Sequence, residues 1–159
     1  MPRKTTKSLV REVQPDRLYN STQVAKLINR VMLNGKKQIA ERLVYGGMEQ
    51  AAKKLKVDNP LEVFEQAFKN IQPHVETRSR RVGGANYQIP FEVKGQRQQH
   101  LTIMWFVAAA RSRKGMSMAD RIAAELMDAY NGQGAAVKKR EDTHKMAEAN
   151  RAFAHFARG

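Results

Sequence analysis

The sequence predicts a mainly α-helical, single-domain fold: a bundle of about six helices with one protruding β-hairpin and an extended basic N-terminal arm. Apolar residues recur at helical spacing over most of the 159 residues, and they alternate at strand spacing only over residues 75–93. Residues 1–19 show neither pattern and contain Pro2 and Pro15, so we expect this basic arm to order on its partner. Neither a repeat nor a low-complexity linker divides residues 1–159, which predicts one domain.

Three helices are expected before the strand pattern. The first follows Ser21, a suitable N-cap, and stops at Asn34-Gly35. Its buried face is formed by Val24, Leu27, Ile28, Val31 and Met32. The second runs from about residue 37 to 55, with Ile39, Leu43, Met48, Ala51, Ala52 and Leu55 on its buried face. We interpret Gly46-Gly47 inside it as a close contact between helices, since each Gly costs roughly 1 kcal/mol relative to Ala. The third begins at Asn59-Pro60 and buries Leu61, Phe64, Ala67, Phe68 and Ile71.

The single strand pattern predicts a β-hairpin over residues 75–93. Residues 75–82 form its first strand, Gly83-Gly84 its turn, and alternating apolar residues up to Val93 its second strand. Pro90 suits an edge position, and both strands of an isolated hairpin are edges. A bare hairpin is marginally stable, so we expect its base to pack on helices.

Three further helices follow the hairpin. Residues 96–111 are apolar on several sides, with Leu101, Met104, Trp105 and Ala108 on one face and Ile103, Phe106 and Val107 widening it, which predicts a central core helix. Ser117 and Asp120 form a capping-box pattern for a helix that ends at Asn131-Gly132. A last helical stretch covers residues 135–150, and the tail at 152–156 either packs or stays mobile.

Composition excludes several classes of protein. The chain has no cysteine, which excludes disulfides, zinc–thiolate sites and cysteine nucleophiles. The longest apolar run, residues 103–110, is far shorter than the ~20 residues that a membrane-spanning helix needs. The basic N-terminus lacks the hydrophobic region of a secretory signal, so we expect a soluble cytosolic protein. The net charge of +14 predicts polyanionic partners, with nucleic acid first and an anionic membrane second.

Basic residues concentrate in windows that contain no acid. These windows span residues 1–11, 17–40, 77–91, 93–119 and 129–140. One interpretation of a charge run is a solvated surface balanced by neighbouring carboxylates, and this suits Glu49 with Lys53 and Lys54. Because the acid-free windows offer no local carboxylate, we favour a surface that binds a polyanion.

The sequence shows no catalytic constellation, and we expect no enzyme, no metal site and no cofactor. The four histidines, His74, His100, His144 and His155, lack metal-ligand spacing. No glycine loop matches a phosphate-binding fingerprint, and the acidic residues are dispersed rather than clustered for Mg²⁺.

RNA is favoured over a membrane because the apolar helix faces are needed for the core, while the cations fall mostly on connectors and the hairpin. The basic residues of the hairpin are arginines, and guanidinium groups bind phosphates through paired hydrogen bonds and stack on bases. Tyr87 beside the turn either stacks on an unpaired base or makes a cross-strand contact. A DNA architectural protein with a β-arm stays open as an alternative.

Several long motifs resemble one known family. Residues 79–90 (SRRVGGANYQIP), 110–113 (ARSR) and 139–153 (KREDTHKMAEANRAF) are similar to signatures of the bacterial-type small-subunit ribosomal protein seven family. The opening Pro2-Arg3-Lys4 and residues 33–37 (LNGKK) match as well, so the resemblance covers essentially the whole chain.

This resemblance implies a helical bundle with a protruding hairpin that is a structural component of the small (30S) ribosomal subunit and takes part in translation. Its members are primary binders of 16S ribosomal RNA (rRNA) at the 3′ major domain and nucleate assembly of the subunit head. They lie near the exit-site tRNA and the mRNA path and touch the ninth and eleventh small-subunit proteins. A cytoplasmic ribosome is expected, with an organellar one left open, and neither a membrane nor a small-molecule substrate is implied.

By position, the resemblance assigns two sets of residues. Those implied to bind rRNA are Arg3, Lys4, Lys7, Arg11, Lys36, Lys37, Arg78, Arg80, Arg97, Arg111, Arg113, Lys114, Lys138, Lys139 and Arg140. Those implied to form a hairpin tip that faces tRNA and mRNA are Arg81, Val82, Gly83, Gly84, Ala85, Asn86 and Tyr87.

Overall fold

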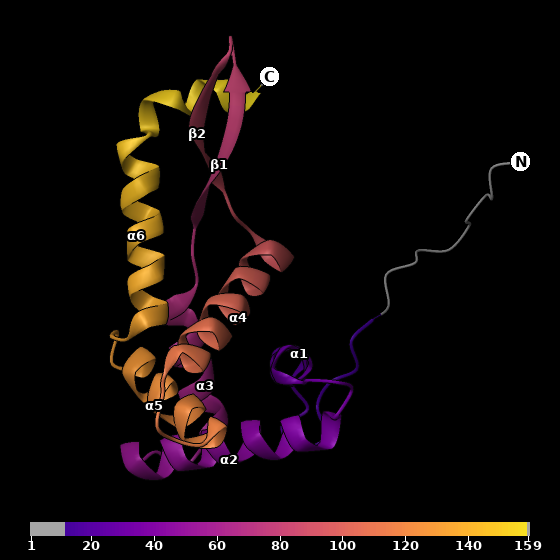
Figure 1. The fold of residues 1–159 in the computed structure, drawn as a ribbon. Helices are drawn as coiled ribbons and strands as arrows, with labels where there is room; N and C mark the ends of the chain where they lie inside the picture. Colours follow the sequence, from indigo (N-terminus) through magenta and orange to yellow (C-terminus); the bar gives the residue numbers. More distant parts are fainter. Residues whose placement is uncertain (1–11, 159) are drawn as a thin grey trace, which may run out of the picture.

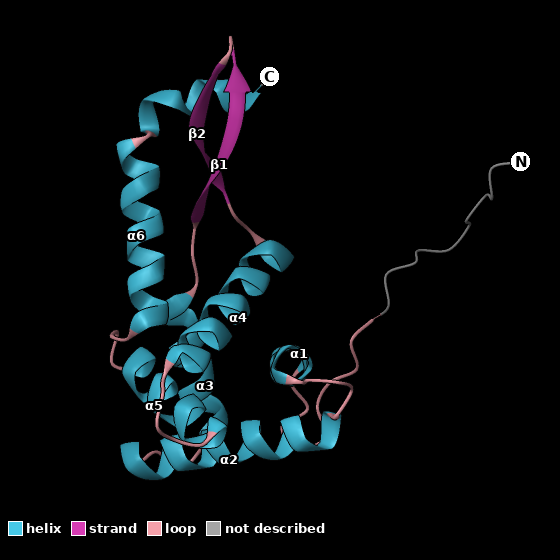
Figure 2. Ribbon diagram, viewed as in Figure 1, coloured by secondary structure: helices cyan, strands magenta, loops and turns pink. Residues whose placement is uncertain are grey.

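The computed structural model describes residues 12–158 and confirms a mainly helical fold with one antiparallel hairpin (Figures 1 and 2). The elements within these residues are α1 (Thr22–Val31), α2 (Lys37–Leu55), α3 (Pro60–Ile71), β1 (Val75–Val82), β2 (Ala85–Glu92), α4 (Gly95–Ser112), α5 (Met118–Tyr130), α6 (Ala135–Ala149) and the 3-10 helix η1 (Arg151–Arg158). Figure 1 shows α2 along one end of the bundle and the hairpin projecting from the other.

Local polar signals fix where two of the helices begin. The Asn59 side chain accepts a hydrogen bond from the backbone N–H of Leu61 at 3.0 Å, directly before Pro60 opens α3. The Ser117 hydroxyl accepts one from the backbone N–H of Asp120 at 3.3 Å at the start of α5. Ser21 precedes α1 as expected, but its side chain makes no capping bond.

Aromatic side chains from α3 and α4 form the centre of the core. The rings of Phe64 and Phe68 lie 4.0 Å apart, and Phe68 lies 5.2 Å from Phe106 on α4. Phe64 and Phe106 are fully buried, and each such side chain contributes about 1.5–3 kcal/mol relative to exposure. This confirms α4 as a central helix of the bundle.

Helices α2 and α5 approach closely at one glycine. A Cβ atom added to Gly47 would lie 2.7 Å from Cγ2 of Ile122 and 3.0 Å from the backbone oxygen of Ala119. The same atom added to Gly46 would have no heavy atom within 4 Å. The interpretation of a close helix contact is therefore confirmed for Gly47 and wrong for Gly46.

Two predicted core positions are wrong. Ile39 on α2 is 51% exposed, because the buried stripe of this helix consists of Ala40, Val44, Gly47, Met48, Ala51 and Ala52. Ala108 on α4 is also exposed, while Thr102 on the same helix is buried. In both helices small or polar residues occupy buried positions, which a reading based on large apolar residues overlooks.

The hairpin has the predicted turn at Gly83-Gly84, and its first strand has the predicted bounds. Strands β1 and β2 pair from Val75 opposite Glu92 to Val82 opposite Ala85. Gly83 and Gly84 have φ of +57° and +90°, a region that other residues rarely adopt. Val93, directly after β2, belongs to the core of the bundle and anchors the hairpin there, and Ile89 on β2 is also buried.

The C-terminal tail packs against the hairpin, which settles the two alternatives left open by the sequence. Helix α6 rises beside β1 and β2, and η1 then turns across the hairpin (Figure 1). The ring of Tyr87 on β2 lies 5.1 Å from Phe153 and 5.5 Å from Phe156.

Part of the basic arm is folded against the helices, which corrects the expectation that residues 1–19 order only on a partner. The buried carboxylate of Asp16 accepts hydrogen bonds from the backbone N–H groups of Leu18, Tyr19 and Ser21 at 2.8–3.0 Å. It also accepts one from the Tyr45 hydroxyl on α2 at 3.1 Å. Burial alone raises the pKa of Asp16, but these hydrogen bonds outweigh it, and the net pKa is lowered.

Candidate nucleic-acid interface

The connector between α1 and α2 displays two of the predicted cations. Asn34 and Gly35 have φ of +52° and +72°, which makes a tight turn before α2. Lys36 and Lys37 follow this turn, and both are exposed. Lys37 has one carboxylate neighbour, Glu41, with Nζ 4.0 Å from Oε1. Such a surface pair is weak, so both ammonium groups are available to a phosphate.

At the root of the hairpin, two predicted cations share one carboxylate. Glu76 on β1 is 6% exposed and accepts a hydrogen bond from Nε of Arg78 at 2.6 Å and from Nη2 of Arg97 at 2.9 Å. Burial alone raises the pKa of Glu76, but the hydrogen bonds from Arg97 and Arg78 outweigh it and lower the net pKa. Arg78 also lies 5.3 Å from the centre of the Phe91 ring. Arg97 therefore joins α4 to the hairpin through Glu76, while Arg78 makes its contacts within the hairpin. Both arginine side chains stay about half exposed.

Toward the outer end of the hairpin, some side chains contact η1 and the others are exposed. Nη1 of Arg80 donates to the backbone oxygen of Phe156 at 2.8 Å, and Tyr87 packs on Phe153 and Phe156. The sequence-based alternatives for Tyr87 did not include this contact. Val82 is half-buried, and the other residues of the tip are exposed: Arg81, Gly83, Gly84, Ala85 and Asn86.

Arg113 is the predicted cation that carboxylates of the protein hold most closely. Its guanidinium donates to Oε2 of the fully buried Glu125 at 3.0 Å from Nε and 2.6 Å from Nη2, and it also pairs with Asp128. Glu125 in turn accepts the backbone N–H of Ala136 at 3.0 Å. Removing one partner of a buried pair leaves an uncompensated charge, so Arg113 is best explained as a structural residue.

Arg140 is also turned toward the protein, since its guanidinium donates to the backbone oxygen of Asn70 at the end of α3. Its neighbours Lys138 and Lys139 at the start of α6 are exposed, and no carboxylate among the described residues pairs with them. At the end of α4, Arg111 and Lys114 are exposed, and Arg111 donates to the backbone oxygen of Arg30 at 3.3 Å. Four predicted cations, Arg3, Lys4, Lys7 and Arg11, lie outside the described residues.

The structure adds basic residues that the predicted set lacked. Lys26 and Arg30 on α1 and His100 on α4 line a cavity of about 430 Å³ between these two helices. Among residues 12–158, no carboxylate lines this cavity. The signal in the sequence is the four-residue spacing of Lys26 and Arg30, which places both on the polar face of α1.

Two histidines that are far apart in the sequence meet at the base of the hairpin. The backbone N–H of His74 donates to Nε2 of His144 on α6 at 3.1 Å, and the rings lie 6.0 Å apart. Burial, and then the charges of Arg140 and His74, lower the pKa of His144. Across residues 12–158 no three His, Asp or Glu side chains gather as a metal site, and no helix in this range is long and apolar enough to span a bilayer.

Comparisons of the sequence with known proteins identify its family. The family model described as ribosomal protein S7p/S5e matches residues 2–151. The small ribosomal subunit protein uS7 of Mesorhizobium japonicum is 56% identical over 146 residues, which cover 92% of this chain and 93% of that protein. The uS7 protein of Francisella tularensis subsp. novicida shows the same identity and coverage. With a match that runs through the helices, the hairpin and the exposed cation pairs, the chain belongs to the ribosomal protein S7p/S5e family.

Proposed function

We propose that this chain is a structural component of the small ribosomal subunit, where it binds 16S rRNA and takes part in translation. The family match over residues 2–151 carries the proposal, together with relatives that are themselves small ribosomal subunit proteins. The net charge of +14 suits a partner with a phosphate backbone. Its place in the cell is therefore the ribosome, and its work is positioning RNA rather than catalysis.

Separated pairs of exposed cations form the proposed rRNA contacts. They lie at the start of α2, at the end of α4 and at the start of α6: Lys36 and Lys37, Arg111 and Lys114, and Lys138 and Lys139. Because the helices hold these pairs at fixed separations, RNA segments that are distant in sequence are brought to defined positions. Phosphate contacts of this kind set register and orientation rather than base specificity.

The cations that also bond to the protein have a secondary part in this proposal. Arg78 and Arg97 keep half of their surface exposed beside Glu76, so they add phosphate contacts at the hairpin root. Arg113 leaves the proposed set because its guanidinium is held by Glu125 and Asp128.

The finer assignments rest on the family resemblance alone. In these assignments, the chain attaches to the 3′ major domain of 16S rRNA as a primary binder and nucleates assembly of the subunit head. It also contacts the ninth and eleventh small-subunit proteins. The hairpin tip, residues 81–87, would face the exit-site tRNA and the mRNA path. The basic residues of the N-terminal arm, Arg3, Lys4, Lys7 and Arg11, would add further phosphate contacts.

The salt dependence of binding tests the proposal. With a transcript of the 16S 3′ major domain, neutralising on the order of 6–10 phosphates gives a slope of log K against log[KCl] between about −4 and −9. Replacing both Lys138 and Lys139 with Gln should make this slope shallower by roughly 1.5, with an unchanged Tm.

A matched pair on another helix controls for the loss of charge. Lys53 and Lys54 are exposed near the end of α2, where Lys53 lies one helical turn after Glu49. Replacing both with Gln should leave the slope unchanged. A slope near −1 for the unaltered protein, or equal effects of the two pairs, would refute the proposed surface. Duplex DNA that competes as well as the transcript would instead indicate a DNA architectural protein.

A further inference from the structure

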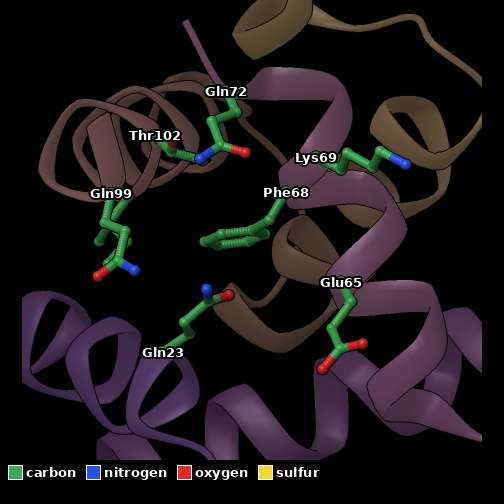
Figure 3. Close-up of a pocket in the computed structure, with 8 residues that line it drawn as sticks. Gln23, Glu65, Phe68, Lys69, Gln72, Gln99 and Thr102 are labelled. Carbon is green, nitrogen blue, oxygen red and sulfur yellow. The ribbon is translucent and has the colours of Figure 1, made fainter. Parts of the chain in front are cut away.

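A cavity of about 220 Å³ opens between α1, α3 and α4, and amide side chains surround it (Figure 3). Gln23 on α1, Gln72 after α3 and Gln99 on α4 lie around the ring of Phe68, with the hydroxyl of Thr102 beside Gln72. The charged ends of Glu65 and Lys69, at the rim, point away from that ring in Figure 3. The interior of the cavity therefore combines uncharged amide groups with the apolar side chains of Phe68 and Ile103.

The amide groups retain unused hydrogen-bonding capacity. Nζ of Lys26 donates to Oε1 of Gln99 at 2.8 Å, which leaves the Gln99 amide nitrogen as a donor to a ligand. Gln23 and Gln72 make no side-chain hydrogen bond within residues 12–158. Each primary amide offers two donors and one acceptor oxygen, so the three groups together can meet a mixed pattern of donors and acceptors.

A second cavity adjoins the first and differs from it in charge. The 430 Å³ cavity between α1 and α4 shares Gln99 and Ile103 with the amide cavity. It also contains Lys26, Arg30 and His100, and it has no carboxylate in its lining. A neutral polar compartment thus lies directly beside a cationic one.

We propose that these two cavities together bind one unpaired nucleotide of an RNA, with the base in the amide cavity and its phosphate beside Lys26 and Arg30. A nucleobase edge presents adjacent donors and acceptors, which side-chain amides match. The Phe68 ring, which is 6% exposed and packs on Phe64 and Phe106, adds only a small apolar contact. Glu65 and Lys69 oppose each other in charge at the rim of the amide cavity, whereas the described lining of the cationic cavity has Lys26 and Arg30 and no carboxylate, so the cationic cavity takes the phosphate.

The size and shape of the site select a single, unpaired nucleotide. Sites for drug-sized ligands occupy about 300–1,000 Å³, and the amide cavity is smaller than this range. A paired base hides its Watson–Crick edge inside the duplex, whereas a base in a loop or bulge can be splayed out into a pocket. This inference rests on the proposed function, and it names a contact that reads a base rather than only the backbone.

Titration of the full chain with mononucleotides tests the site directly. The four ribonucleoside 5′-monophosphates and ribose 5-phosphate are each added to isotope-labelled protein, and the side-chain amide NMR signals are followed. At least one mononucleotide should shift the signals of Gln23, Gln72 and Gln99, while ribose 5-phosphate should shift only groups of the cationic cavity. Absence of any mononucleotide-specific shift would overturn the inference.

Variants of two glutamines whose side chains make no hydrogen bond within residues 12–158 test the same site with the 16S transcript. Replacing Gln23 and Gln72 with Leu should weaken binding by about tenfold, as expected for lost hydrogen bonds to a base. It should leave the salt slope unchanged, because amides neutralise no phosphate. Replacing Gln66, an exposed glutamine on α3 outside the cavity, with Leu is the matched control and should change neither quantity.

The outcomes separate this inference from the proposed function. If the unaltered protein binds the transcript with a steep salt slope but the Gln23 and Gln72 variant binds equally well, only the nucleotide site is wrong. If the unaltered protein shows no steep slope, the proposed function fails. Thermal unfolding of each variant identifies any loss of affinity that reflects loss of the fold.

Discussion

Replacing each glycine of the Gly46-Gly47 pair with Ala in separate variants measures how closely α2 and α5 pack. Both residues lie inside the same helix, so Ala gains roughly 1 kcal/mol of helix propensity at either position. At Gly46 the added methyl group meets no heavy atom within 4 Å. We therefore expect Gly46→Ala to stabilise the fold by about 1 kcal/mol, which raises Tm by roughly 2–4 °C for a chain of this size.

At Gly47 the same methyl group has no room. It would lie 2.7 Å from Cγ2 of Ile122, 2.9 Å from Cβ of Ile122 and 3.0 Å from the backbone oxygen of Ala119. Neither Cβ nor a helical backbone oxygen can rotate aside, so the two helices must separate. Overpacking of this kind costs about 1–3 kcal/mol, so the free energy of unfolding of Gly47→Ala should lie about 1–3 kcal/mol below that of Gly46→Ala.

Urea unfolding followed by far-ultraviolet circular dichroism measures both free energies with one protocol. Because the two variants add the same methyl group to neighbouring residues of one helix, differences in propensity and in the unfolded chain largely cancel. Equal stability of the two variants would refute the close contact between α2 and α5. A more stable Gly47→Ala would contradict the assigned face of α2 as well.

Three further predictions concern titrating and aromatic groups. Since the pKa of Asp16 is lowered in the fold, its contribution to stability should be present at neutral pH and be lost as pH falls below about 4. The Asp16→Asn variant should be less stable at pH 7, and its stability in urea unfolding should depend less on pH in the acid range. The pKa of His144 is also lowered, so NMR titration of its imidazole should give a pKa below about 6.5, and the free energy of unfolding should rise with pH through that region. A higher pKa would contradict the burial of His144 beside His74. Phe153→Ala should speed amide hydrogen exchange in η1 and leave Tm nearly unchanged, whereas unchanged exchange would mean that Tyr87 does not hold this segment.

The elements that sequence reasoning located well are those with local signals. Asn59-Pro60 and Ser117 start α3 and α5 because capping needs only residues within one turn. Gly83-Gly84 fixes the hairpin turn through the backbone angles that it permits. The family itself was also recognisable, because its motifs are continuous stretches of sequence.

Sequence reasoning falls short where contacts between residues that are far apart in the chain determine burial or pairing. Arg113 lies in a window without acids, yet Glu125 and Asp128 reach it from α5. The C-terminal tail packs on Tyr87, which lies more than sixty positions earlier in the chain. On α2, a search for large apolar residues placed Ile39 in the core and overlooked the buried Gly47. Charge patterning along the chain therefore predicted the total cationic character better than it predicted which cations reach solvent.

The buried carboxylate of Glu125 has a consequence for how the cation pairs are spaced. One of its oxygens holds Arg113 on the connector that follows α4, and the other accepts the backbone N–H of Ala136 at the start of α6. Lys114 lies next to the first of these attachment points, and Lys138 lies two residues after the second. A single fully buried side chain thus holds the two segments that carry these patches of positive charge, so its replacement would change the separation of the patches without removing any cation.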